Sequence, residues 1–355
     1  MLIDGIHIPL TAPFTRDGGY YMHKLEYNVR RYCLTPASGL VALSSEMEGA
    51  ALSDAETAEA LRVIGAVADP AKVLVAAVAK DSVRSALSVA EMAAREGFDL
   101  LLLAAPPQWE CLSEQEVMLH FQAIADRSPL PIALGSGARR QGYRLSVDEI
   151  ADLARHNNVL GLYDHGLTVE RFRAIAAATG GVRRDVVVTN VFAPVTRRMV
   201  HRDETEEAGF VAAASIGSAG AGIGNAGAGM TAPKRGLKTR TKPVGFQVMA
   251  TGRAAGFADL LTSGLAGAML SLAACSPQAC YEVYAAFKDG DAALAEEKVR
   301  RLAEADARLD RLGVGGVKYG CDYNGYYGGE PRLPRLPLNA EERASLELAL
   351  SGIRN

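Results

Sequence analysis

The stretch Val159–Gly166, VLGLYDHG, decides how this chain folds. A short apolar run leads into Tyr163, Asp164 and His165, and a glycine then precedes a helix that we expect to begin near Thr168. An apolar run that ends in polar residues and turns directly into a helix is typical of a buried parallel strand at its carboxyl end. We therefore expect the chemistry of this protein to lie where such strand ends converge.

Five earlier apolar runs repeat this pattern, and each is followed by a helical segment. These predicted strands cover 6–13, 39–43, 73–79, 99–105 and 131–134. Ser53 with Glu56, and Ser146 with Glu149, form capping boxes that mark the starts of two helices. Six strand–helix units at a spacing of roughly 25 to 30 residues fit a parallel sheet, and eight such units close a barrel. The sequence thus predicts an α/β protein with a (β/α)8 TIM barrel.

The last two barrel strands are expected at 244–250 and 267–272, behind an atypical insertion at about 182–243. That insertion holds a Gly/Ala-rich tract, SIGSAGAGIGNAGAGM, and a basic end. Because the tract cannot bury enough apolar surface to offset its ordering entropy, we expect it to be a long flexible excursion.

After Cys275 the pattern becomes wholly helical, with predicted helices at 277–287, 292–312 and 340–353. A Gly/Tyr-rich connection precedes the last of them. We therefore divide the chain into a barrel at 1–274 and a C-terminal helical region at 275–355.

The composition favours an enzyme or binding protein for small molecules. The chain has 355 residues, of which 49% are hydrophobic, so it can bury a large core. A net charge of −3 gives no general attraction to nucleic acid or anionic membranes. No apolar run reaches the roughly 20 residues of a membrane helix, and the N-terminal residues lack the pattern of a secretory signal. We expect a cytoplasmic protein without a cofactor, and its scattered cysteines predict no metal site.

Several strand ends, taken in order, resemble those of the dihydrodipicolinate synthase / N-acetylneuraminate lyase family of aldolases. The segments that carry the resemblance are 5–18, 39–53, 106–107, 161–164 and 328–338. The resemblance runs through nearly the whole chain except about 181–243. It implies a (β/α)8 barrel with a C-terminal helical region, assembled as a homo-oligomer, either a tetramer or a dimer.

The chain departs from that family at its reactive residues. The family forms a Schiff base between a lysine on strand six and pyruvate or a related 2-oxo acid, but this chain has Tyr163 at that position, and a phenol cannot form an imine. The family's proton-relaying tyrosine falls on Gly135. The family binds the substrate carboxylate with a string that contains two threonines. At the first of these positions Ser45 keeps a hydroxyl group, and at the second Glu46 has a carboxylate instead. The resemblance thus implies the family scaffold without its Schiff-base lysine.

Other positions of the family's binding site are kept. Arg140 stands where the family uses an arginine to hold the substrate carboxylate, a task that suits a guanidinium group. Trp109 falls where an aromatic residue reaches a neighbouring subunit's site, and Gly252 matches a glycine whose backbone lines the pocket. We predict that the substrate contacts Ser45, Arg140, Trp109 and Gly252, with Lys80 at the end of the third strand as a further contact.

Tyr163 and Glu46 are the predicted catalytic residues, and each also has a structural interpretation. The phenol can donate a proton to a developing oxyanion, or it fills the space that a lysine would occupy. Glu46 can act as an acid or base, or it pairs with Lys80 or a nearby arginine. Lys80 is either a relocated imine-forming residue or a solvated lysine. Asp164 and His165, together with Glu46 or Glu48, are candidate ligands of a divalent metal, although no tight ligand spacing supports that interpretation.

These observations predict a lyase, of the aldolase or hydro-lyase type, that acts on a small 2-oxo acid or related carboxylate without a Schiff-base lysine. Two alternatives stay open: a non-catalytic ligand-binding or sensor protein on an aldolase scaffold, and a metal-dependent aldolase. The expected partners are a small carboxylate substrate and further copies of the chain, with no nucleic acid and no membrane.

Overall fold

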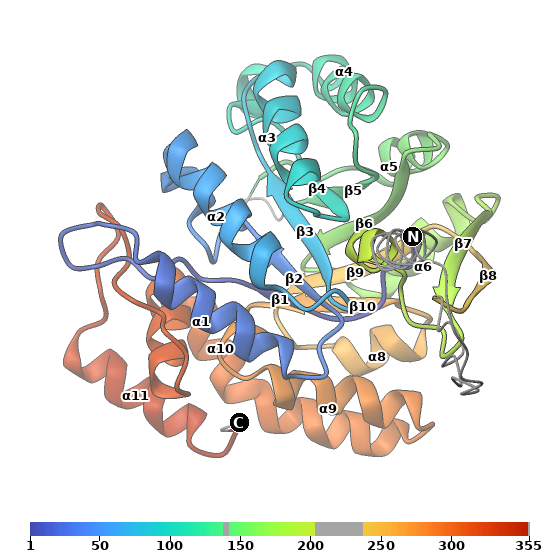
Figure 1. Ribbon diagram of the computed structural model, residues 1–355. Coiled ribbons are helices and arrows are strands. Elements are labelled where there is room, and N and C mark those ends of the chain that lie inside the picture. Colours follow the sequence, from blue (N-terminus) through green and yellow to red (C-terminus); the bar gives the residue numbers. More distant parts are fainter. Residues whose placement is uncertain (138–141, 203–236, 354–355) are drawn as a thin grey trace, which may run out of the picture.

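Eight parallel strands close a barrel in this protein (Figure 1). The structure is a computed structural model that describes residues 1–137, 142–202 and 237–353. The barrel strands, in their order around the barrel, are β1 (Gly5–Pro9), β10 (Gly267–Leu270), β9 (Gln247–Gly252), β6 (Val159–His165), β5 (Ile132–Ser136), β4 (Leu100–Ala104), β3 (Val73–Val78) and β2 (Gly39–Ala42). The predicted (β/α)8 TIM barrel is therefore confirmed.

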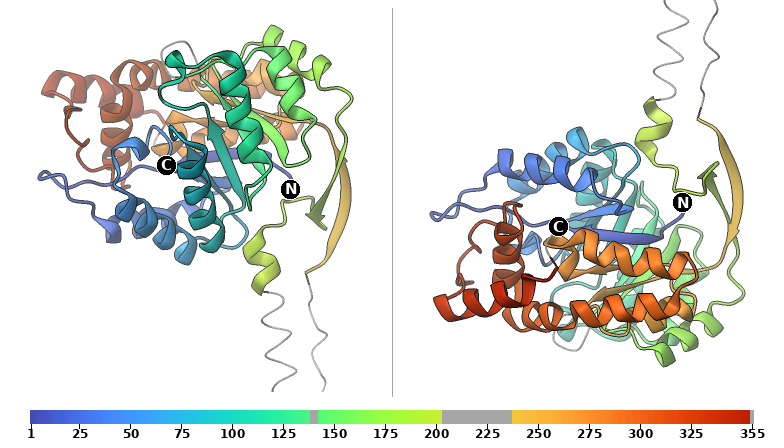
Figure 2. Two further views of the ribbon diagram at one scale, coloured as in Figure 1. Left: turned by 90° about the horizontal axis from the view of Figure 1, so that it is seen from above. Right: turned by 90° about the horizontal axis from the view of Figure 1, so that it is seen from below.

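Helices alternate with the strands along the chain and surround the barrel (Figure 2). The α-helices that lie wholly within the described residues are α1 (Met22–Cys33), α2 (Asp54–Val67), α3 (Val83–Arg95), α4 (Glu114–Ala125), α5 (Val147–Ala154), α6 (Val169–Ala178), α8 (Phe257–Thr262), α9 (Pro277–Lys288), α10 (Ala292–Tyr323) and α11 (Ala340–Leu350). Short 3-10 helices lie at Gly49–Ala51, Trp109–Cys111 and Ser271–Ala274. Both predicted capping boxes are present, at Ser53 before α2 and at Ser146 before α5. None of the described helices is long and apolar enough to cross a bilayer.

Alternate residues of each strand point to opposite sides of the barrel wall. On β3, Val73 and Val75 belong to the cluster inside the barrel, whereas Leu74 and Ala76 pack in the cluster that includes the helices. This alternation follows from the two-residue period of a strand. Aliphatic side chains thereby fill the barrel interior, and Tyr163 belongs to the same inner cluster.

The C-terminal helices pack beside the barrel (Figure 2). The sequence predicts that the long helix ends at Leu312, but α10 continues to Tyr323 across a break at Gly313. Gly313 has φ 61° and ψ −147°, a conformation that glycine adopts without a steric penalty. The chain therefore bends at this glycine and resumes the helix.

The insertion between α6 and β9 forms a small sheet that the sequence analysis did not predict. β7 (Arg184–Thr189) pairs antiparallel with β8 (Thr239–Val244) outside the barrel. Val186 and Val188 of β7 pack with Leu2, so the sheet lies beside the N-terminal residues. The Gly/Ala-rich tract at 215–230 lies outside the described residues.

A buried ion pair joins the loop after β2 to α10. The Nζ atom of Lys318 lies 2.5 Å from Oε1 of Glu48, and both side chains are at most 1% exposed. Lys318 also donates to the carbonyl of Glu330 at 2.8 Å. Arg335, which is half exposed, lies 3.3 Å from the other carboxylate oxygen of Glu48. Each buried charge therefore depends on the other for compensation.

We expect Lys318→Met to lower the free energy of unfolding by about 3 kcal/mol, because it leaves the buried carboxylate of Glu48 with only the half-exposed Arg335 and the backbone N–H of Arg332 as partners. Denaturant-induced unfolding measures this loss. The exposed pair between Arg62 and Glu59 supplies the control, since Glu59→Gln should cost less than about 1 kcal/mol. Equal losses in the two variants would contradict the role assigned to the buried pair.

Candidate active site

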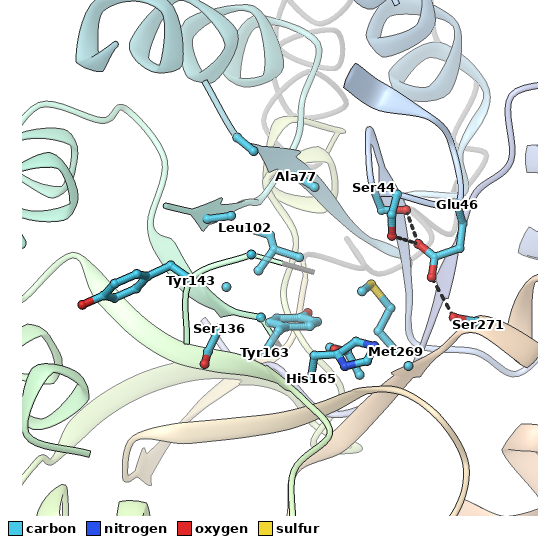
Figure 3. Close-up of a pocket in the computed structure, with 18 of the residues that line it drawn as sticks. Ser44, Glu46, Ala77, Leu102, Ser136, Tyr143, Tyr163, His165, Met269 and Ser271 are labelled. Atoms are coloured by element: carbon cyan, nitrogen blue, oxygen red, sulfur yellow. Dashed lines mark hydrogen bonds between the residues drawn. The ribbon is translucent and has the colours of Figure 1, made fainter. Parts of the chain in front are cut away.

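A cavity of about 720 Å³ opens at the carboxyl ends of the barrel strands. Tyr163, Met269 and His165 lie at its base, with Glu46 on one side and Tyr143 on the other (Figure 3). Strand ends and the loops after them supply most of the lining, and α10 covers part of the mouth. Among the lining residues that the structure describes there is no lysine.

The structure brings most of the predicted site residues to this cavity. Lys80 does not line it, and its Nζ atom instead lies 3.8 Å from a carboxylate oxygen of Asp54 at the start of α2. Arg140 falls within 138–141, outside the described residues. The predicted site residues that line the cavity are Ser45, Glu46, Trp109, Tyr163 and Gly252.

Tyr163 points into the barrel, and its hydroxyl meets a buried histidine. The Oη atom lies 2.7 Å from Nδ1 of His7 on β1, and the two residues are 2% and 0% exposed. Burial lowers the pKa of His7 to about 4 and raises the pKa of Tyr163. Both side chains are therefore neutral at pH 7 and are hydrogen-bonded to each other, while Nε2 of His7 is buried without a partner among the described residues. The base of the cavity thus carries a neutral pair at this point.

Three hydroxyl groups hold the carboxylate of Glu46 at the side of the cavity (Figure 3). Ser44 and Ser45 donate to Oε2 at 2.9 and 3.0 Å, and Ser271, just after β10, donates to Oε1 at 2.8 Å. Hydrogen bonds to an ionised acceptor are stronger than those between neutral groups. Glu46 is thus fixed in one orientation, with both of its oxygens engaged.

Asp164 and His165, the candidate metal ligands, point in different directions. Asp164 is fully buried, and Arg171 of α6 donates to both of its carboxylate oxygens at 2.7 to 3.2 Å. Arg144 lies 3.6 Å from Asp164. His165 instead lines the cavity. Within the described residues, no group of three or more His, Cys, Asp and Glu side chains is placed to hold a metal ion.

His165 is a polar cavity residue that the sequence analysis considered only as a metal ligand. Its Nδ1 atom is buried and has no hydrogen-bond partner among the described residues. Burial lowers the pKa of His165, which the neighbouring Glu46 partly opposes. The sequence could have indicated that His165 faces the cavity, because it lies two residues after Tyr163 and therefore shares the same face of the strand.

The mouth of the cavity contains charged residues that no local pattern indicates. The Nε atom of Arg253, after β9, lies 3.6 Å from Asp306 and 3.9 Å from Asp310, both on α10. Asp306 also accepts a hydrogen bond from the backbone of Ala254 at 2.9 Å. Arg253 is far from Asp306 and Asp310 in the sequence, and these residues meet only because α10 folds back over the barrel. No local sequence pattern indicates this contact.

The buried His7 makes stability depend on pH. Folded His7 stays neutral down to about pH 4, whereas the unfolded residue takes up a proton near pH 6.5. Because the unfolded state binds more protons within this window, His7 should remove about 3 kcal/mol of stability as the pH falls through it. We expect His7→Gln to flatten the curve of unfolding free energy against pH between these values. Unfolding titrations with the exposed His23→Gln variant as control measure this, and parallel curves for all three proteins would contradict it.

The chain matches known proteins of one family. The model of the dihydrodipicolinate synthetase family matches residues 2–190. A probable mitochondrial 4-hydroxy-2-oxoglutarate aldolase of Emericella nidulans is 27% identical over 172 residues, which cover 45% of this chain and 54% of the relative. N-acetylneuraminate lyase of Rhizobium meliloti is 30% identical over 163 residues, which cover 46% of this chain and 54% of the relative. The chain thus spans about half the length of the curated relatives it matches.

Solved structures extend the likeness in fold to the whole chain. A putative dihydrodipicolinate synthetase from Pseudomonas aeruginosa superposes with a TM-score of 0.77 at 19% identity, over 99% of this chain and 100% of that one. A dihydrodipicolinate synthase from Acinetobacter baumannii, complexed with pyruvate, gives a TM-score of 0.76 at 22% identity, over 99% of both chains. The family match covers more than half of the chain, and the barrel agrees with it. This chain belongs to the dihydrodipicolinate synthetase family.

Proposed function

We propose that this protein is a lyase that transfers a proton at the carbon next to the ketone of a small 2-oxo acid, and that it does so without a Schiff base. One observation carries the proposal: Tyr163 lies at the base of the cavity, and no lysine occurs among its described lining residues. An imine requires an amine. Relatives named as an aldolase, a lyase and a synthase support the lyase class.

An imine-free lyase needs groups that bind the substrate carboxylate and groups that move the proton. In our proposal Ser45 and Arg140 hold the carboxylate, while Trp109 and the backbone of Gly252 bound the substrate. Tyr163 and the carboxylate of Glu46 are the proton-transfer groups of this scheme. The position of Glu46 beside Ser45 supports it, since the two side chains lie 3.0 Å apart at the cavity wall.

A non-catalytic ligand-binding protein is the second candidate, and two observations favour it. The hydroxyl of Tyr163 is occupied by His7, and both oxygens of Glu46 are occupied by serine hydroxyls. Groups whose hydrogen bonds are already made within the protein stay in a fixed position, and they do not require a proton from a substrate. Such a protein would bind a small carboxylate without turning it over.

Pyruvate dissolved in deuterium oxide distinguishes the two candidates. We expect the wild-type protein to exchange the methyl protons of pyruvate for deuterium, as followed by proton NMR, while borohydride traps no covalent adduct in the mass spectrum. Tyr163→Phe should slow the exchange by a factor of about 100, because it removes a proton-transfer group. The exposed Tyr27→Phe variant is the control and should exchange at the wild-type rate.

Each other outcome has a definite meaning. A borohydride adduct on any lysine would contradict the imine-free reaction. Binding of pyruvate without exchange would favour the ligand-binding protein. Neither binding nor exchange would contradict a 2-oxo acid as the ligand.

A further inference from the structure

We infer that Glu48 and Lys318 are positioning residues of this site. Their buried ion pair holds the β2 loop, which comprises residues 43–49, in a strained conformation that presents Ser45 and Glu46 to the cavity. The inference rests on the proposed function, since that function assigns substrate contacts to these two residues. It adds a pair that meets no ligand itself and acts only through the loop.

Both ends of the β2 loop have left-handed backbone conformations. Leu43 has φ 62° and Glu48 has φ 54°. Among the described residues, Phe192 is the one other non-glycine residue with a positive φ. A left-handed conformation is costly for a residue with a side chain, and it persists only where the surrounding structure holds it. The loop therefore needs contacts that offset this cost.

The strained backbone carries the residues that line the cavity. Ser44, Ser45 and Glu46 lie between the two left-handed positions, and all three are lining residues. The N–H of Glu48 donates to the carbonyl of Ser45 at 3.1 Å. The N–H of Gly49 donates to the carbonyl of Ser44 at 3.2 Å. A change of φ at Glu48 would move the N–H of Gly49 away from Ser44 and open this turn.

The C-terminal region supplies the contacts that hold Glu48. The Nζ atom of Lys318 on α10 lies 2.5 Å from Oε1 of Glu48, and both side chains are at most 1% exposed. At the other carboxylate oxygen, the backbone N–H of Arg332 donates at 3.2 Å, and the half-exposed Arg335 lies at 3.3 Å. Lys318 is itself fixed, because it donates to the carbonyl of Glu330 at 2.8 Å. The buried ammonium group is therefore a rigid anchor for the loop.

The ion pair lies outside the cavity but links two of its walls. Neither Glu48 nor Lys318 is among the described lining residues. Glu46, two residues before Glu48, does line the cavity, and so does Val317, the residue before Lys318. The pair thus joins the β2 loop to α10, and its loss reaches a ligand only through the position of the loop.

The first test measures the binding of pyruvate by isothermal titration calorimetry, at a temperature where unfolding titrations show each variant to be folded. We expect Lys318→Met to raise the Kd at least about tenfold, because only molecules with the loop in its binding conformation take up the ligand. Arg198→Met is the matched control. It breaks a buried ion pair with Asp99, 3.6 Å apart, which precedes β4 at the opposite end of the barrel from the cavity. This control should lose stability and keep the wild-type Kd.

A double variant separates the position of the loop from the burial of charge. Lys318→Met combined with Glu48→Gln removes both charges, so neither is left buried without its partner. We expect the double variant to regain part of the stability that Lys318→Met alone loses. Its Kd should stay raised at least about tenfold, because the loop is still without its anchor. An ion pair that served only stability would instead let binding recover together with stability.

Hydrogen exchange of the backbone amides tests the loop in the ligand-free protein. The N–H of Gly49 is hydrogen-bonded only while the β2 loop keeps its turn. In Lys318→Met we expect this amide to exchange at least about ten times faster than in the wild type, through local opening of the loop. Arg198→Met should leave the rate at Gly49 unchanged, although it lowers the stability of the whole protein.

The outcomes separate this inference from the proposed function. If the wild-type protein binds no pyruvate, the proposed function fails, and the exchange rate at Gly49 alone decides the inference. If the wild type binds pyruvate and Lys318→Met keeps both the Kd and the slow exchange at Gly49, the inference is overturned and the proposed function stands. A raised Kd without faster exchange at Gly49 also overturns it, because the effect then does not act through the loop. Should Lys318→Met fail to fold, the double variant carries both measurements.

Discussion

The ion pair between Asp164 and Arg171 is the constraint on which the site depends. Asp164 points out of the barrel, where Arg171 of α6 binds both of its carboxylate oxygens. A shift of β6 by one residue would bring this buried charge inside and turn its neighbours outward. The pair therefore fixes the direction of Tyr163 and His165, which share the inner face of the strand. The identity of one outward-facing residue thus determines which two side chains of β6 line the cavity.

The phenol of Tyr163 determines the electrostatics at the base of the cavity. A buried ammonium group must be compensated, as Lys318 is by Glu48 and Lys72 is by the backbone carbonyls of Thr35 and Ala37. Tyr163 instead forms a neutral pair with His7 and needs no counter-charge. The charged cavity residues accordingly lie higher, in the loops and on α10. The cavity therefore has a neutral base and charged groups at its walls and mouth.

Much of the barrel could be predicted because its signals are local. Apolar runs and the capping boxes at Ser53 and Ser146 depend on residues that are close in the sequence. The sheet of β7 and β8 was missed, since its two strands are far apart in the chain and pair outside the barrel. The site was predicted in part for the same reason. Glu46 and Tyr163 lie at strand ends that a pattern reveals, whereas Arg253 meets α10 only through the long-range fold.

The difference between a binding site and a catalytic site can be argued from hydrogen bonds that must break. A hydrogen bond to a charged group contributes about 1.5 to 3 kcal/mol, so releasing Glu46 from its three hydroxyls adds several kcal/mol to any barrier in which it acts as a base. Each 1.4 kcal/mol slows a reaction about tenfold. Any transfer of a proton to Glu46 must therefore meet the cost of releasing these hydroxyls, whereas a site that only binds a ligand does not have to break them.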